Sequence, residues 1–199
     1  MSESSQNGFG VTAEDIRRYD WQSLLSDEVH LECRDIWCSF RSAIEECRTA
    51  GDDVGQRVYS LLYSVAYFRA DYEVKGNPYG SLIKFVDGSH TLCAEELTDA
   101  DRLALKGTVE GISNPEFRAR VADVLWVTEK DIKAARLAVV AFVESAQRLK
   151  CSTHSFQHIS RLNRAAQICS NKGFEAERAA VLSAIEASIV ECDDRNKPT

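Results

Sequence analysis

The sequence predicts an all-α protein, and three observations support this prediction. Of the 199 residues, 44% are hydrophobic, which is enough to bury a substantial core. Only three prolines and ten glycines interrupt the chain, and Ala, Leu, Glu and Arg fill the long segments between them. Within these segments apolar residues recur every three or four positions, the period of an amphipathic helix. We therefore expect stacked antiparallel helical hairpins, TPR/HEAT-like in pattern, with about eight helices.

The first helices are predicted from the residues at their ends. Thr12, followed three residues later by Asp15, resembles a capping box and places a helix start there. Gly51 is the expected end of the second helix, and Asp52 or Asp53 is the expected cap of the third. The short connection at this glycine predicts that the second and third helices form an antiparallel hairpin. These three helices are expected over about residues 13–25, 29–49 and 54–73.

Residues 74–93 break the helical pattern. Asn77-Pro78 and nearby glycines oppose a helix in the first part of this segment. Asp87-Gly88 lies between two apolar runs and is a turn signal typical of a hairpin. We therefore expect one small β-hairpin near residues 82–93, which is stable only if it packs on the helices.

The second half of the chain repeats the capping patterns. Thr98 with Asp101, Asn114 before a proline, and Thr128 with Asp131 each predict a helix start. The expected helices span about residues 99–110, 115–127, 129–150, 153–171 and 174–191. A single helical domain would then cover residues 11–192, between a disordered N-terminus at 1–10 and a disordered tail at 193–199.

The predicted helix at 129–150 carries two apolar faces. Large and small residues form one face at heptad spacing, and Ala134, Ala138 and Ala141 form a second, narrow one. Such a helix can be approached closely by other helices on two sides, as stacked hairpins require. Residues 120–125 and 138–144 also resemble residues 164–169 and 180–186, at offsets of 44 and 42, which predicts a helical repeat.

Residues 118–149, with the phrases RVADVLW and AARLAVVAFVESAQRL, resemble an uncharacterised bacterial family of helical domains. The matching positions are Asp123, Trp126, Lys130, Asp131 and Ala135. In that family the helical domain lies N-terminal to a HEPN-related domain of unknown function. The resemblance implies a helical module that forms the N-terminal arm of a larger protein, with any activity residing in a domain that this sequence does not contain.

Charge and cysteine content narrow the range of partners and compartments. Residues 1–110 carry a net charge of −9 and residues 111–199 a net charge of +2, so nucleic acid is not expected as a partner. No leader sequence and no apolar run of about 20 residues is present, so we expect no membrane association. Seven cysteines without a CxxC pattern predict reduced thiols and a cytoplasmic protein.

Two spacings around residue 150 resemble functional motifs. Cys151, His154 and His158 have the spacing of metal ligands on one helix, but no fourth ligand follows, so we expect a helix start with two half-exposed imidazoles and a buried thiol instead. Arg148 and His154 have the spacing of a HEPN nuclease motif, in which they would stabilise a phosphate and transfer a proton. Leu149 departs from that motif, so these two residues are only an alternative catalytic pair.

No nucleophile elbow, P-loop, dinucleotide-binding motif or zinc-protease motif occurs, and no cofactor is expected. Tyr59, Tyr63 and Tyr67 could form an aromatic recognition face, although core packing with hydroxyls at the rim is the favoured interpretation. With Arg118 and Arg136 they are the candidate interaction residues. We expect a non-enzymatic module that binds a protein partner or an adjacent domain. The alternatives are a HEPN-like RNA-acting protein and a helical bundle that binds a metal or a small ligand.

Overall fold

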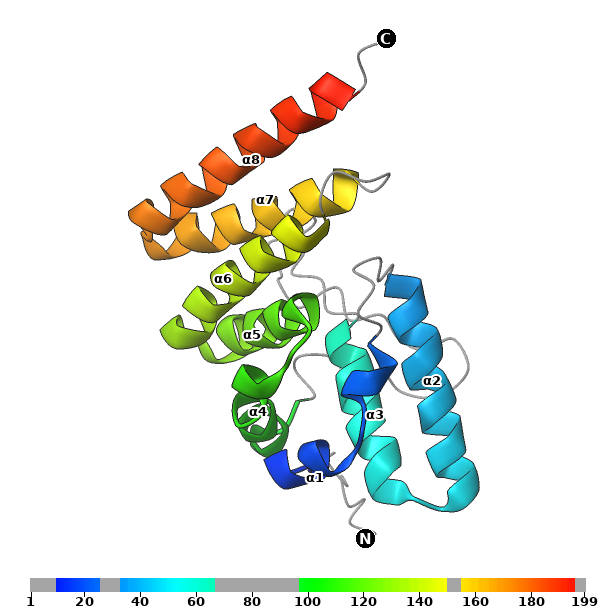
Figure 1. Ribbon diagram of the computed structural model, residues 1–199. Helices are drawn as coiled ribbons and strands as arrows, with labels where there is room; N and C mark the ends of the chain where they lie inside the picture. Colours follow the sequence, from blue (N-terminus) through cyan, green and yellow to red (C-terminus); the bar gives the residue numbers. More distant parts are fainter. Residues whose placement is uncertain (1–9, 26–32, 67–96, 150–154, 196–199) are drawn as a thin grey trace, which may run out of the picture.

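The computed structural model describes residues 10–25, 33–66, 97–149 and 155–195. These residues form eight α-helices and two short 3-10 turns, and no strand occurs among them, which confirms the all-α class (Figure 1). The predicted β-hairpin near 82–93 lies outside the described residues. In chain order the elements are α1 (Ala13–Arg18), η1 (Gln22–Leu24), α2 (Cys33–Ala50), α3 (Asp53–Ala66), α4 (Asp99–Lys106), η3 (Val109–Gly111), α5 (Pro115–Glu129), α6 (Ile132–Leu149), α7 (Ser155–Lys172) and α8 (Glu175–Arg195).

The most extensive packing is between helices that follow one another in sequence. The pairs α2–α3, α5–α6, α6–α7 and α7–α8 make the most extensive contacts, and α8 lies at one end of the succession (Figure 1). The α2–α3 pair joins the rest through contacts of α3 with α5 and of α1 with α3 and α4. This packing is that of a helical bundle or a stack of hairpins.

Several helix ends form as their sequences predict. Thr12 and Thr98 each accept a hydrogen bond from a backbone N–H three residues later, and in both capping boxes the aspartate at that position accepts from the threonine N–H. Asp52 accepts a bond from the N–H of Gly55 at 2.9 Å, which caps α3. Gly51 ends α2 with a φ of 70°, in the left-handed region that glycine adopts without a steric penalty.

The first predicted helix is shorter than expected. α1 ends at Arg18, because Tyr19 is already extended, and only one 3-10 turn follows at 22–24. Trp21 lies between them, and its indole N–H donates to the carbonyl oxygen of Ile16 at 3.1 Å. Burying this large side chain against the core therefore turns the chain back where the apolar spacing alone suggested a continuous helix.

The boundary between α5 and α6 also differs from the expectation. Thr128 is not a cap, because it lies inside α5 and its hydroxyl donates to the carbonyl oxygen of Val124 at 2.8 Å. The helix continues to Glu129, and Lys130 is its C-cap with a φ of 57°. Asp131 is the cap of α6, and its carboxylate accepts from the N–H of Lys133 at 2.8 Å.

The remaining helices in this half differ less from the prediction. α4 is shorter than the predicted 99–110, because Gly107 follows its last residue and a separate 3-10 turn forms at 109–111. α8 extends to Arg195, past the predicted end of the domain at 192.

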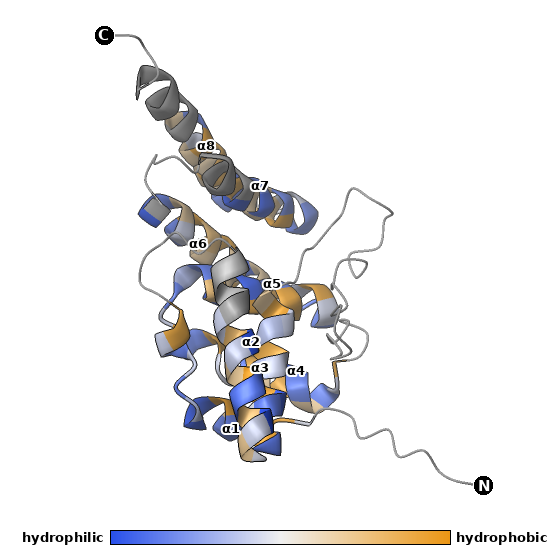
Figure 2. Ribbon diagram, turned by 90° about the vertical axis from the view of Figure 1, so that its right-hand side faces the viewer, coloured by the Kyte–Doolittle hydropathy of each residue, from blue (hydrophilic) through white to orange (hydrophobic). Residues whose placement is uncertain are grey.

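The core is continuous from the first helix to the last. Rings of Trp21, Phe40 and Phe117 pack with centroids 5.4–5.8 Å apart, joining η1, α2 and α5. The apolar core continues through α6 and α7 to Val181 of α8. Figure 2 shows hydrophobic stretches, in orange, where α3, α4 and α5 meet. The core therefore ties the α2–α3 pair to the four C-terminal helices.

α6 is covered on both of its predicted faces. Ala134, Ala138 and Ala141 are 7%, 0% and 0% exposed, and Ala135, Val139, Phe142 and Ala146 of the neighbouring face are also buried. Its two extensive neighbours are α5 and α7. The sequence-based prediction that the alanine-lined helix is sandwiched between two others is therefore confirmed.

Buried ion pairs connect α5 directly with α7, the helices that precede and follow α6 in the chain. Arg164 forms two hydrogen bonds to Asp123, at 2.6 and 2.8 Å. Arg161 pairs with Glu116, which also accepts from Arg120 at 2.8 Å. Because charges are costly to bury without a partner, these pairs fix one relative position of the two helices.

Candidate interaction surface

The predicted tyrosine face is mostly core. Tyr63 is only 6% exposed, so it cannot belong to an open recognition face. Tyr59 is half-buried, edge-on to Tyr19 with centroids 5.7 Å apart, and also packs near Phe40. Tyr67 lies outside the described residues. Only part of Tyr59 is therefore left for contact with a partner, because α1 and α2 cover this side of α3.

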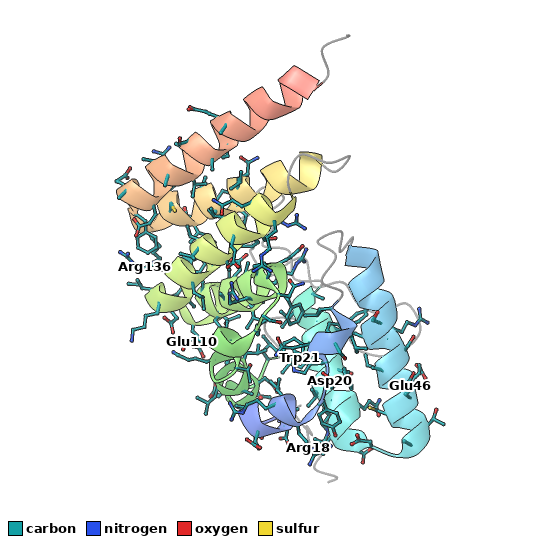
Figure 3. The ribbon with its side chains drawn as sticks, viewed as in Figure 1. Arg18, Asp20, Trp21, Glu46, Glu110 and Arg136 are labelled. Atoms are coloured by element: carbon teal, nitrogen blue, oxygen red, sulfur yellow. The ribbon has the colours of Figure 1, made fainter. Side chains whose placement is uncertain are left out.

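The two predicted arginines hold helices together. Arg118 donates to the carbonyl oxygen of Ile112 at 2.6 Å and pairs with Glu144 of α6. Arg136, labelled in Figure 3, lies 2.6 Å from a carboxylate oxygen of Glu177, and its guanidinium stands 4.4 Å from the ring centroid of Phe174. It connects α6 with the start of α8, although its side chain remains 59% exposed. An interaction role for either arginine stays a prediction.

The two candidate motifs near residue 150 are only partly described. Cys151 and His154 lie outside the described residues, and the side chain of His158 is not described either. Arg148 is exposed and pairs with Glu144 at 2.7 Å. Within the described ranges no cluster of three His, Cys, Asp or Glu side chains is arranged to hold a metal ion. Both motifs therefore stay predictions.

The two described thiols are free and lie at helix–helix contacts. Cys169 is buried, and Cys47 is half-buried beside Asp52. Burial raises the pKa of both thiols, and neighbouring carboxylates raise that of Cys47 further. A nucleophilic cysteine needs the opposite shift, so neither thiol is suited to catalysis.

A cleft of about 470 Å³, which the sequence did not predict, lies between residues 16–22 and residues 107–111. Arg17 and Gln22 reach across it and donate hydrogen bonds to backbone carbonyl oxygens of the other wall, at 3.1 and 3.3 Å. Trp21, labelled in Figure 3, also lines the cleft and is otherwise buried. These two polar side chains are thus used to join the two walls.

The most distinctive surface is a row of small residues on α8. Ala176, Ala180, Ser183 and Ala187 are spaced by four, three and four positions, so they share one helix face, and all four are exposed. Leu182, which precedes Ser183 and lies on another face of α8, is 39% exposed. We call these four residues the open row.

The same positions on α6 are buried. Counting back 42 residues from the open row gives Ala134, Ala138, Ala141 and Ser145, which are 7%, 0%, 0% and 1% exposed. This offset is the one at which residues 138–144 resemble residues 180–186. α8 buries Val181 against the core and has α7 as its one extensive neighbour among the described helices. α6 has two such neighbours.

Comparison with protein families gives one match that covers most of the chain. Residues 6–197 match the family described as Domain of unknown function (DUF7380). The chain belongs to this family. Searches among curated proteins and among solved structures found no match. The resemblance to an uncharacterised domain family is thereby confirmed at this level, and the family description assigns no chemistry to any residue.

Charge differs strongly between the last two helices of this DUF7380 chain. α7 contains three basic residues and no acidic one, whereas α8 contains six acidic residues against two arginines, a net charge of −4. Glu175, Arg178 and Glu186 are exposed on α8. The open row therefore lies on an acidic helix.

Within the described ranges no helix has both the length and the apolar character needed to cross a bilayer.

Proposed function

We propose that this chain is a non-enzymatic helical interaction module, and that the open row of α8 receives an α-helix from a partner protein or an adjacent domain. The observation that carries this proposal is the contrast between α6 and α8. The same pattern of small residues is covered by a helix in α6 and is exposed in α8.

Two ion pairs of α6 show which helices border its two apolar faces. Glu144, three positions after Ala141 and beside the covered row, pairs with Arg118 of α5. Arg136, three positions before Val139, pairs with Glu177 at the start of α8. The covered row of α6 therefore borders a packed helix, whereas the equivalent row of α8 is exposed.

The residue types in the row also support binding. Terminal helices of repeat proteins normally present a polar outer face, since nothing covers them. Three of the four side chains in the open row are alanines, which gain nothing from contact with water but allow another helix to approach closely. A surface of this kind is suited to helix docking, and no described group near it provides chemistry for a reaction.

Site-specific photocrosslinking tests the proposal. Benzoylphenylalanine replaces Ala180 in the open row or, as a control, Ala100, an exposed alanine of α4. After irradiation in extract of the source cells, we expect a discrete adduct only from position 180, identifiable by mass spectrometry. Excess unlabelled chain should compete for the adduct, and the Ala176→Gln/Ala180→Gln variant should not. Equal adducts from both positions, or equal competition by the variant, would contradict the proposal.

A further inference from the structure

The cleft between residues 16–22 and residues 107–111 has the size of a small-molecule site. Its volume of about 470 Å³ lies within the usual range of ligand pockets, roughly 300–1,000 Å³. Its two walls are distant in the sequence, and hydrogen bonds from Arg17 and Gln22 to backbone carbonyl oxygens hold them together. The walls are therefore fixed relative to each other before any ligand enters, which lowers the entropic cost of binding.

The lining of this cleft carries charges of both signs. Arg17 and Arg18 contribute two guanidinium groups, and Asp20 contributes one carboxylate. Ile16 and Trp21 add apolar surface beside them. Figure 3 labels Arg18, Asp20 and Trp21, which belong to the wall formed by the end of α1 and the residues that follow it. Such a lining favours a small polar ligand that carries both a negative and a positive group.

Arg17 keeps donors for the negative group. A guanidinium has five N–H donors, and Arg17 forms hydrogen bonds with two described residues. One acceptor is the carbonyl oxygen of Gly107 at 3.1 Å, and the other is the carboxylate of Glu14 at 3.4 Å. The side chains of Arg17 and Glu14 are 56% and 83% exposed, so their pair contributes little stability. A carboxylate from a ligand can therefore replace Glu14 at small cost.

Asp20 offers a partner for the positive group. Its carbonyl oxygen accepts a hydrogen bond from the Ser23 hydroxyl at 2.7 Å, which fixes the turn that carries it. The side chain of Asp20 is exposed, and its carboxylate has no hydrogen bond or ion pair with another residue in the part of the chain that the structure describes. An ammonium group in the cleft would therefore meet a carboxylate that is not already paired.

We propose that this cleft binds a free amino acid, with the ligand carboxylate at Arg17 and the ligand ammonium group at Asp20. The planar fork of an arginine matches a carboxylate, and both protein residues line the same cleft three positions apart in the sequence. This site is separate from the open row of α8 and does not depend on helix docking there. It would give the chain a small-molecule ligand in addition to a protein partner.

Two-dimensional proton–nitrogen NMR of the isotope-labelled full chain tests the proposal. The probes are the twenty common amino acids, each added separately. The reporter is the indole N–H of Trp21, which donates to the carbonyl oxygen of Ile16, and both residues line the cleft. The chain has three tryptophans, and Trp21→Phe assigns the reporter resonance. We expect at least one amino acid to shift this resonance saturably and to leave that of Trp126, which does not line the cleft, unchanged.

Two derivatives of the amino acid that binds test its charged groups one at a time. The N-acetyl form lacks the ammonium group, and the amide form lacks the carboxylate. We expect each to bind at least about tenfold more weakly than the parent amino acid, because each loses a charge-assisted hydrogen bond. Equal affinities of the three compounds would overturn the proposal. A saturable shift of the Trp21 resonance by inorganic phosphate with the affinity of the amino acid would also overturn it, since the cleft would then be a general anion site.

Variants of the two charged residues complete the test. Asp20→Asn should lower the affinity for the amino acid to that for its N-acetyl form, whereas Glu46→Gln, at an exposed glutamate of α2 labelled in Figure 3, should not change it. Arg17→Met should weaken binding of the N-acetyl form but not of the amide. Circular dichroism should show the wild-type helix content in all three variants. If no amino acid shifts the Trp21 resonance saturably, or if Asp20→Asn leaves the affinity unchanged, the proposal is wrong.

Discussion

Arg164 of α7 donates two hydrogen bonds to Asp123 of α5, which lies 41 positions earlier in the sequence. The Nε of Arg164 is 2.8 Å from one carboxylate oxygen, and its Nη2 is 2.6 Å from the other. Both side chains are largely buried, at 11% and 5% exposed. The pair therefore connects the first and third of three successive helices. Removing one partner would leave an uncompensated charge in the interior.

Arg164→Met is expected to lower the free energy of unfolding by about 3 kcal/mol, because Asp123 would remain buried without its cation. Urea denaturation followed by circular dichroism measures this change. Arg148→Met is the matched control, since Arg148 is exposed and its pair with Glu144 should contribute less than about 1 kcal/mol. If the free energy of unfolding falls equally in the two variants, the buried pair contributes no more stability than the exposed one, and the prediction is wrong.

The Arg164→Met loss should also depend on pH. Burial raises the pKa of the Asp123 carboxyl above its ordinary value, and Arg164 opposes this rise. Without the arginine, folded Asp123 should bind a proton more readily than the unfolded chain does. The variant should therefore recover part of its stability relative to wild type as the pH falls from about 7 to about 5. A loss that is constant over this range would contradict the account.

Gly55→Ala is expected to destabilise the protein, although alanine is the better helix former. A Cβ atom at Gly55 would lie 2.4 Å from a carboxylate oxygen of Asp52, 2.7 Å from the sulfur of Cys47 and 2.8 Å from the ring of Tyr19. Moving these three side chains should cost about 1–3 kcal/mol in urea denaturation. A Cβ atom at Gly111 would have no neighbour within 4 Å, so Gly111→Ala should leave the urea midpoint of unfolding unchanged or raise it.

Acid should weaken the contact between α4 and the start of α6. The hydrogen bond from Lys106, 2.6 Å away, holds the pKa of the Asp131 carboxyl below its ordinary value of 3.8. A lowered pKa contributes stability that is present above that value and is lost as the pH falls through and below it. Lys106→Met should therefore flatten the fall in melting temperature below about pH 4. If the melting temperature of this variant falls below pH 4 as steeply as that of wild type, the Lys106–Asp131 pair does not cause the loss of stability in acid.

The sequence predicted those parts of the fold that local chemistry decides. Caps at Thr12 and Thr98 and the glycine at 51 need only neighbouring residues, and each forms as predicted. The break after Arg18 could not be predicted, because it depends on where Trp21 finds its hydrogen bond and its aromatic neighbours. Thr128 failed as a cap because a hydroxyl can also bond back to the preceding helical turn.

Only part of the candidate surface could be predicted from the sequence. The spacing of Ala134, Ala138 and Ala141 indicated a covered row, and this row is buried. The same spacing recurs in Ala176 and Ala180, but whether a small-residue row is covered or open depends on which helices pack beside it. The ion pairs of Arg118 and Arg136 likewise join residues 26 and 41 positions apart, which a local pattern does not reveal.

One comparison tests the central claim most directly, namely that equivalent rows are covered in α6 and open in α8. Ala138→Leu and Ala180→Leu add the same three carbons at positions 42 residues apart, and urea denaturation gives the free energy of unfolding of each. We expect Ala138→Leu to lose about 1–3 kcal/mol through overpacking, and Ala180→Leu to stay within about 0.5 kcal/mol of wild type. Equal losses at the two positions would show that the α8 row is already covered and would contradict the proposed docking surface.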